Sequence, residues 1–427
     1  GGEDGGIGPD SFELVCDEHV VNITVTGTSS GTTAGDLFFL LAGAVRIQSD
    51  GKIVTSAFNL FADEPGLNSF LMCFTADGRL DSTFADQGFL LVAPGSADWE
   101  SAGMELTPSD DIVVGGTFDP GGLSQLAAAR ITSAGVYDSS FGTGGVALAG
   151  LGLAARGMSV ALQTDGAVLV SGEDSGDATV ARFTSAGVLD TSFGAGGPAR
   201  ATFARDSTAY DVAVQDDGKV VIVGEVSRNG NTEDFMLARF NPDGTPDTTF
   251  GAAGQVVSAL SSDDNTAYSV VLQQDGKLLV AGTADSGSGA QAILARFTEG
   301  GALDTGFGTA GWVPLAPIGL SAMGAGLALR ADGRALVVGG SSDTAQERVT
   351  IMQLMPDGSL DPSFAAGGIY TQTVVDSVSF FGADLDIACD GSLVVLGAFS
   401  DEVSQSVGLS LLKLSAAGAP ISWGCSP

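Results

Sequence analysis

Short runs of hydrophobic residues alternate with clusters of glycine, aspartate and serine along almost the whole chain. Between residues 255 and 297, for example, hydrophobic runs occupy Gln255–Leu260, Ala267–Gln273, Lys277–Thr283 and Ala292–Phe297. Short runs rich in valine, leucine and isoleucine, bounded by turn residues, are typical of antiparallel strands. No convincing amphipathic helix of about 12 or more residues is present. The pattern therefore predicts an all-β protein.

The chain repeats itself with a period of about 57 residues. An Asp-Gly turn precedes a hydrophobic run at Asp50, Asp165, Asp217, Asp275, Asp332 and Asp390, and Ser109-Asp110 takes its place in the second unit. A Leu-Asp-x-x-Phe-Gly turn places an aromatic residue at Phe84, Phe141, Phe193, Phe250, Phe307, Phe364 and Trp423. A glycine precedes this turn in every unit, at Gly78, Gly135, Gly187, Gly244, Gly301, Gly358 and Gly418. Seven units therefore account for nearly the whole chain.

Four strands in each of seven units predict a seven-bladed β-propeller. An isolated four-stranded sheet leaves both faces exposed, whereas sheets packed around a common axis cover one another and leave few open edges. An open β-solenoid would need shorter repeats and capping elements. We therefore expect residues 20–427 to form a single domain.

The last unit contains only its first three strands, near Ala383–Ala388, Leu393–Ala398 and Gly408–Leu414. A spare strand, Val20–Thr26, precedes the first Asp-Gly hairpin. We expect this N-terminal strand to complete the last blade and to close the ring without a covalent link. Residues 1–19 are expected to form a flexible, acidic, glycine-rich leader. The leader is either a tether behind a removed export or lipid-attachment signal or an ordinary frayed terminus.

The four cysteines contain no Cys-x-x-Cys pair, so neither a zinc ribbon nor a thioredoxin-type motif is expected. Closure of the ring places Cys16 near Cys425 and predicts a disulfide that clamps the seam, which suggests an oxidising compartment. The alternative is two unpaired thiols. Cys73 and Cys389 lie in the first and last units, where a second bridge and two small buried thiols are both open alternatives.

The charge balance excludes several classes of partner. The 427 residues include 17 Lys and Arg, 51 Asp and Glu and one His, which gives a formal charge of −34. Such a charge repels phosphate backbones and anionic lipid, so binding to nucleic acid or to a membrane through a basic patch is not expected. His19 is the only histidine and leaves little for a zinc site or imidazole catalysis. The hydrophobic run Leu37–Val45 is too short to cross a bilayer.

An arginine and an aspartate recur eight residues apart in four units: Arg130 and Asp138, Arg182 and Asp190, Arg239 and Asp247, Arg296 and Asp304. We expect each pair to be an ion pair that clips its own blade, rather than part of a ring of anion-binding arginines. Asp81 and Asp361 persist where the arginine is absent, so the aspartate is also expected to cap the following turn. The aromatic column is expected to fill gaps between blades.

Asn241–Asp247 carries oxygen-bearing side chains at alternate positions, as calcium loops do. Asp243 is matched only by Asp77 and Asp357. A repeated metal site would keep its ligands, so an Asx turn is the preferred interpretation. We expect no cofactor, with calcium as the open alternative.

The loops between strands vary most, and many loops on one rim carry acidic residues. The candidate binding residues there are Trp99, Glu100, Asp174, Asp177, Asp234, Asp263 and Asp264. Loops on a rigid scaffold are where binding usually occurs, and this rim suits a cation, a basic partner or sugars. Trp99 is the loop tryptophan expected to serve as an exposed aromatic. The alternative is a set of solvated loops kept soluble by their charge.

These anchors resemble the delta-60 repeat family, in which an Asp-Gly-Lys hairpin is followed by a Leu-Ala-Arg-Phe strand and an Asn-Pro-Asp-Gly-x-x-Asp-x-x-Phe-Gly turn. Gln273–Gly282 (QQDGKLLVAG) and Leu237–Gly251 (LARFNPDGTPDTTFG) carry the resemblance most clearly. It covers all seven units and weakens at Ser109-Asp110 and at Ile421. The resemblance implies a β-propeller of exported or surface proteins of bacteria, without catalytic residues to transfer.

Three functions are compatible with this sequence. The first is an exported or cell-surface, non-catalytic propeller, extracellular or periplasmic, that binds a protein or polysaccharide through its acidic rim loops. The second is a calcium-dependent propeller hydrolase or lactonase that uses carboxylates at the mouth of the central channel. The third is a structural module of a larger surface assembly. One fold hosts many activities, so the fold alone does not select among them.

Overall fold

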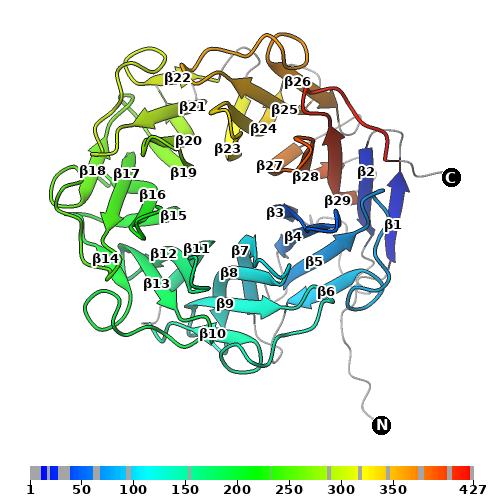
Figure 1. The fold of residues 1–427 in the computed structure, drawn as a ribbon, viewed down its shortest axis with the longest axis horizontal. Coiled ribbons are helices and arrows are strands. Elements are labelled where there is room, and N and C mark those ends of the chain that lie inside the picture. The colour runs from blue at the N-terminus through cyan, green and yellow to red at the C-terminus, as the bar shows by residue number, and fades with distance from the viewer. Residues whose placement is uncertain are drawn as a thin grey trace.

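The computed structural model describes residues 11–16, 20–26, 39–60, 68–92, 98–151, 155–230, 232–285, 290–315, 320–342, 347–373, 379–401 and 406–423. Every regular element among them is a β-strand, and the strands form seven antiparallel sheets arranged in a ring around a central axis (Figure 1). The described residues include no helix long and apolar enough to cross a membrane. The seven-bladed propeller predicted from the sequence is confirmed.

Six blades are consecutive along the chain, and the first strand of each is innermost (Figure 1). The first three are β3 to β6 (Phe39–Ile47, Ile53–Leu60, Asn68–Phe74, Phe89–Val92), β7 to β10 (Asp98–Leu106, Ile112–Asp119, Gln125–Ile131, Val146–Leu148) and β11 to β14 (Ala155–Leu162, Val168–Asp174, Asp177–Phe183, Ala199–Ala201). The next three are β15 to β18 (Ser207–Val214, Val220–Ser227, Glu233–Phe240, Gln255–Ser258), β19 to β22 (Asn265–Leu272, Leu278–Asp285, Ala290–Phe297, Trp312–Pro314) and β23 to β26 (Leu320–Leu329, Ala335–Ser342, Glu347–Leu354, Ile369–Thr373).

The seventh blade joins the two ends of the chain. Its inner strands are β27 (Ser379–Ile387), β28 (Leu393–Asp401) and β29 (Ser406–Leu414), and β2 (Val20–Thr26) pairs antiparallel with β29. The predicted closure by the N-terminal strand is therefore confirmed. The expected leader needs a correction, because β1 (Ser11–Cys16) pairs with β2 as a fifth strand of this sheet.

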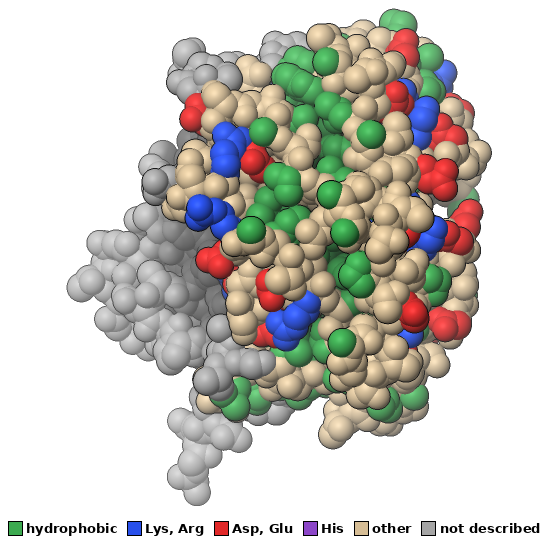
Figure 2. Space-filling model, turned by 90° about the vertical axis from the view of Figure 1, so that its left-hand side faces the viewer, with side chains coloured by type: hydrophobic (Ala, Val, Ile, Leu, Met, Phe, Trp, Pro, Cys, Tyr) green, Lys and Arg blue, Asp and Glu red, His purple; other side chains and the backbone are tan. Residues whose placement is uncertain are grey.

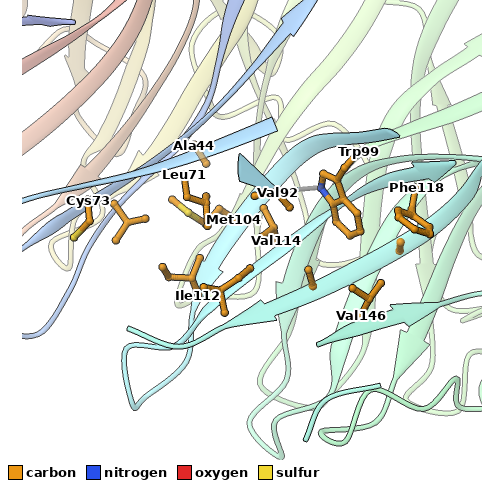
Figure 3. Close-up of a cluster of buried hydrophobic side chains, with 14 of the residues drawn as sticks. Ala44, Leu71, Cys73, Val92, Trp99, Met104, Ile112, Val114, Phe118 and Val146 are labelled. Carbon is orange, nitrogen blue, oxygen red and sulfur yellow. The ribbon is translucent and has the colours of Figure 1, made fainter. Parts of the chain in front are cut away.

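Hydrophobic layers between neighbouring blades form the core. Figure 3 shows one layer between the first two blades, where Leu71, Met104 and Val114 are almost completely buried. The tryptophan of this layer, Trp99, is 0% exposed, and its ring lies 5.7 Å from that of Phe118. Each blade therefore depends on its neighbours to cover its hydrophobic faces.

The repeated aromatic residue plugs the junction between successive blades. All seven members of this column are at most 2% exposed. A Cβ on Gly187, whose φ is +74°, would lie 2.9 Å from the ring of Phe141 in the preceding blade. The seam repeats this contact, because a Cβ on Gly78 would lie 2.7 Å from the ring of Trp423. The ring therefore closes with the same packing that joins its internal blades.

Carboxylates protect the free edges of several innermost strands. Asp384 and Asp386 of β27 accept hydrogen bonds from the backbone N–H groups of Val45 (3.0 Å) and Ile47 (2.8 Å) in the first blade. Asp211 of β15 accepts one from Val270 N–H (2.8 Å) in the next blade. These bonds satisfy donors that an edge strand leaves unpaired. Burial raises the pKa of Asp211 despite its hydrogen bonds.

Candidate functional site: the loop face and the Tyr210–Tyr268 cluster

The antiparallel order of the blades gives the ring two distinct faces. Hairpins between the first and second strands and turns between the third and fourth lie on one side, which we call the turn face. Connections between the second and third strands, and between blades, lie on the other side, the loop face. Seen from the side, acidic and basic side chains alternate along one edge of the disc, and hydrophobic side chains form a band across its outer wall (Figure 2).

The turn face carries the repeated polar residues. In all four predicted Arg–Asp pairs the guanidinium Nε donates to a carboxylate oxygen of its partner at 2.7–2.9 Å. Each guanidinium also lies 4.4–4.8 Å from the centre of its blade's phenylalanine ring. A second nitrogen of each arginine donates to a backbone carbonyl of the following blade. These arginines are therefore held in contacts within and between blades.

Three blades replace the arginine with other groups. In the first blade Lys52 Nζ lies 3.0 Å from a carboxylate oxygen of Asp81. In the sixth blade Gln353 donates to Asp361 (2.6 Å) and accepts from Arg330 (2.7 Å). In the seventh blade Lys413 donates to the carbonyl of Ala76 in the first blade (3.2 Å). A polar contact therefore crosses the seam as well.

The aspartates of this face cap turns, as expected. Asp243, in the turn considered for calcium, accepts hydrogen bonds from the backbone N–H (3.0 Å) and the hydroxyl (2.6 Å) of Thr245. Burial raises the pKa of Asp247, but hydrogen bonds from Thr249 and the charge of Arg239 outweigh it and lower that pKa to about 2. Among the residues that the structure describes, no group of three or more His, Cys, Asp or Glu is arranged to hold a metal ion.

The predicted binding residues lie toward the loop face but do not form one site. Trp99, expected to be an exposed loop residue, lies buried in β7, because its ring packs between the first two blades. Glu100 follows it in β7, with a carboxylate oxygen 3.5 Å from Arg156. Asp174 is 1% exposed and forms an ion pair with Arg200. Asp177 begins β13 on the same connection and is half-buried.

The remaining predicted residues meet between the fourth and fifth blades. Asp234 is 6% exposed and forms an ion pair with Arg228. The carbonyl of Asp263 accepts from Asn265 (2.7 Å), and the carboxylate of Asp264 accepts from the N–H of Glu233 (3.2 Å). Burial and the nearby carboxylate of Asp264 raise the pKa of Glu233. Asp234, Asp263 and Asp264 therefore share one loop cluster.

The cysteine predictions have different outcomes. Cys73 is a buried free thiol and Cys389 an exposed free thiol, so no bridge joins them. Cys16 ends β1, and Cys425 lies outside the described residues. The predicted Cys16–Cys425 disulfide therefore stays a prediction. Residues 1–10 of the leader and His19 also lie outside the described part of the chain.

The structure brings together a cluster that the sequence analysis missed. Tyr210 of β15 and Tyr268 of β19 are half-buried, and their ring centres lie 5.5 Å apart at an angle of 49°. Glu225 of β16 accepts hydrogen bonds from the hydroxyl of Tyr210 and from that of Thr266, each at 2.9 Å. We call these four residues the Tyr210–Tyr268 cluster. Its sequence signal is a Thr-Ala-Tyr triplet that recurs at Thr208 and Thr266, in the fourth and fifth blades.

The environment keeps the two phenols neutral. Burial, followed by the charge of Glu225, raises the pKa of Tyr210, and burial also raises that of Tyr268. The cluster lies toward the loop face, since Thr266 is the second residue of β19 and Glu225 is near the end of β16. It therefore offers two fixed aromatic rings and one carboxylate near the central axis.

Comparisons with known proteins define the class of this chain. Residues 48–84, 163–193, 215–250, 273–307 and 330–364 match the family model described as "Domain of unknown function (DUF5122) beta-propeller". No curated protein sequence matches the chain. Together with the seven sheets, the five matched segments show that the chain is a β-propeller repeat protein.

Similar solved structures share this architecture at low sequence identity. The polysaccharide lyase Uly1 is 9% identical with a TM-score of 0.51, over 96% of this chain and 100% of that one. An ulvan lyase of polysaccharide lyase family PL25 is 12% identical with a TM-score of 0.50, over 93% and 98%. Semaphorin 2a of Drosophila is 8% identical with a TM-score of 0.48, over 90% and 75%. At these identities the likeness concerns the fold.

Proposed function

We propose that this chain is an exported or cell-surface β-propeller of the delta-60 repeat type that binds a partner through its loop face and catalyses no reaction. One observation carries the proposal: the two faces differ in how their polar residues are used. Arginines and aspartates of the turn face recur from blade to blade and are held in contacts within and between blades. The acidic groups of the loop face recur in fewer blades, as with Glu173 and Glu225, which hold equivalent places in the third and fourth, and such variation is expected where a scaffold presents a specific surface.

The loop face suits a basic or hydroxyl-rich partner, such as a surface protein or a polysaccharide. The chain carries a formal charge of −34, which attracts cationic surfaces over several ångströms and speeds encounter with them. The acidity of the chain and its resemblance to exported repeat proteins support a location outside the cytoplasm. Fractionation of cells producing the full chain, followed by detection with an antibody, tests that location.

A binding screen with matched charge variants tests the proposed function. The full chain is applied to a glycan array and to a surface-protein extract, with and without calcium. In one variant Asp177→Asn and Asp264→Asn remove two charges from the loop face, and in the control Asp86→Asn and Asp216→Asn remove two from the turn face. We expect the loop-face variant to lose binding and the control to retain it. Absence of any binder, equal loss in both variants, or conversion of an array glycan to a new product would contradict the proposal.

A further inference from the structure

The Tyr210–Tyr268 cluster presents aromatic faces rather than free phenol groups. The hydroxyl of Tyr210 donates to Glu225. The two rings lie at 49° to each other, and both residues are half-buried, so part of the surface of each stays exposed. A ligand that reaches the cluster therefore meets two electron-rich ring surfaces in a preset arrangement.

Glu225 supplies a negative charge beside these rings. Each of its two carboxylate oxygens accepts one hydrogen bond, from Tyr210 and from Thr266, and an ionised carboxylate can accept about four in all. Within the described part of the chain Glu225 forms no ion pair. Glu173 likewise forms no ion pair with a described residue, and its carboxylate lies 3.5 Å from the hydroxyl of Thr208. Acceptor capacity and charge at Glu225 are therefore still available to a ligand.

These features select the chemistry of the ligand. An anion would meet Glu225 and Glu173, against one nearby cation, Arg156, which already faces Glu100 at 3.5 Å. A neutral sugar would gain from donors in the site, but the hydroxyls of Tyr210 and Thr266 already donate to Glu225. An ammonium group donates only and carries the charge that both a carboxylate and an aromatic face attract.

We propose that the Tyr210–Tyr268 cluster binds an ammonium group of the ligand, held against the exposed surfaces of the two tyrosine rings and by the carboxylate of Glu225. This inference rests on the proposed function and narrows it, because it names the chemical group that one part of the loop face recognises. The ammonium can be carried by an amino sugar or by a lysine side chain. The negative charge of the chain raises the local concentration of either cation.

Calorimetric titration of the full chain tests this site with three probes: a trimer of β-linked glucosamine, the N-acetylated trimer and trilysine. The N-acetylated trimer keeps the sugar frame and loses the charge, so we expect it to bind at least about tenfold more weakly than glucosamine trimer, as one lost cation–π and charge contact implies. If trilysine binds more tightly than the glucosamine trimer and is weakened by the same substitutions in the cluster, the ammonium group belongs to a protein partner.

Four variants separate the cluster from the overall charge. Glu225→Gln and Tyr268→Leu are expected to weaken the ammonium probe by about tenfold or more. Tyr268→Phe keeps the ring and is expected to bind the probe more tightly than Tyr268→Leu, whereas Asp216→Asn, which removes one charge from the turn face, is expected to stay within about twofold of the wild type. Thermal melts followed by circular dichroism establish that each variant is folded, and Glu225→Gln carries the test if Tyr268→Leu is not.

Several results would overturn this inference. They are no binding of either ammonium probe at millimolar concentration, equal binding of the N-acetylated trimer, or equal losses in Glu225→Gln and Asp216→Asn. If the screen captures a partner through Asp177 and Asp264 that is insensitive to Glu225→Gln and Tyr268→Leu, the inference fails and the proposed function stands. If the screen finds no partner whose binding depends on the loop face, the proposed function itself fails.

Discussion

Arg46 of β3 joins three blades near the central axis, and replacing it offers a direct measure of how the seam is held. Its guanidinium donates to Asp384 of the seventh blade (2.7 Å) and to Glu105 of the second (2.8 Å), and also to the backbone carbonyl of Val45. The side chains of Arg46 and Asp384 are only 23% and 21% exposed. Arg46→Met keeps most of the packing volume and leaves two carboxylates without their cation.

Breaking a buried ion pair by removing one partner typically costs about 3–5 kcal/mol. Glu105 is 35% exposed, so solvent stabilises part of the charge left behind. We therefore expect Arg46→Met to lower the free energy of unfolding by about 2–4 kcal/mol at neutral pH. Urea denaturation, with the midpoint and the slope both fitted, measures this difference.

Two further variants make this reasoning refutable. Arg79→Met removes an exposed cation 3.7 Å from Asp77, and we expect a change within about 0.5 kcal/mol. Adding Asp384→Asn and Glu105→Gln to Arg46→Met removes the unpaired charges and should restore most of the lost stability. If Arg46→Met costs no more stability than Arg79→Met, or if the triple variant is no more stable than the single one, the ion pairs of Arg46 do not hold the seam.

Three other predictions concern the turn face and the seam. Asp247→Asn should lower stability at neutral pH and flatten its acid dependence. The folded pKa of Asp247 of about 2 lies below its unfolded value, so the wild type loses about 2–3 kcal/mol as pH falls from about 5 to about 1; equal acid profiles in urea would refute this. Gly187→Ala should destabilise more than Gly196→Ala, because a Cβ at Gly187 meets backbone at 2.3 Å while one at Gly196 meets nothing within 4 Å; melting temperatures that rank the other way would count against the packing account. Non-reducing mass spectrometry should find Cys16 joined to Cys425, and two unmodified thiols would rule this disulfide out.

The sequence was sufficient for the blades because their signals are local. An Asp-Gly turn and the hydrophobic runs on either side of it define paired strands without knowledge of distant contacts. Ser109-Asp110 fits the same turn, since Asp110 adopts a φ of +62°. The clip residues were also predictable, because Arg239 and Asp247 belong to one blade and recur in others at the same spacing.

The candidate site was harder to predict because it depends on contacts between blades. Trp99 stands among mostly polar residues in the sequence, and it is buried because its ring packs in the layer between the first two blades, beside Phe118 of β8. Tyr210 and Tyr268 are 58 residues apart and meet because their strands occupy equivalent places in adjacent blades. Lys52 approaches Asp81 from the Asp-Gly turn of its blade, as Lys219 and Lys277 approach Asp247 and Asp304, and this contact between two separate columns becomes visible only in the structure.

Hydrogen exchange of β2 tests the central structural claim, the closed ring on which the loop face depends. The account predicts that the amides of Val20–Thr26 that pair with β29 are protected and lose protection together with β29 as urea is added. Exchange of Val20–Thr26 at the rate of an unstructured peptide, while Ser406–Leu414 stays protected by β28, would show that the N-terminal strand does not close the ring.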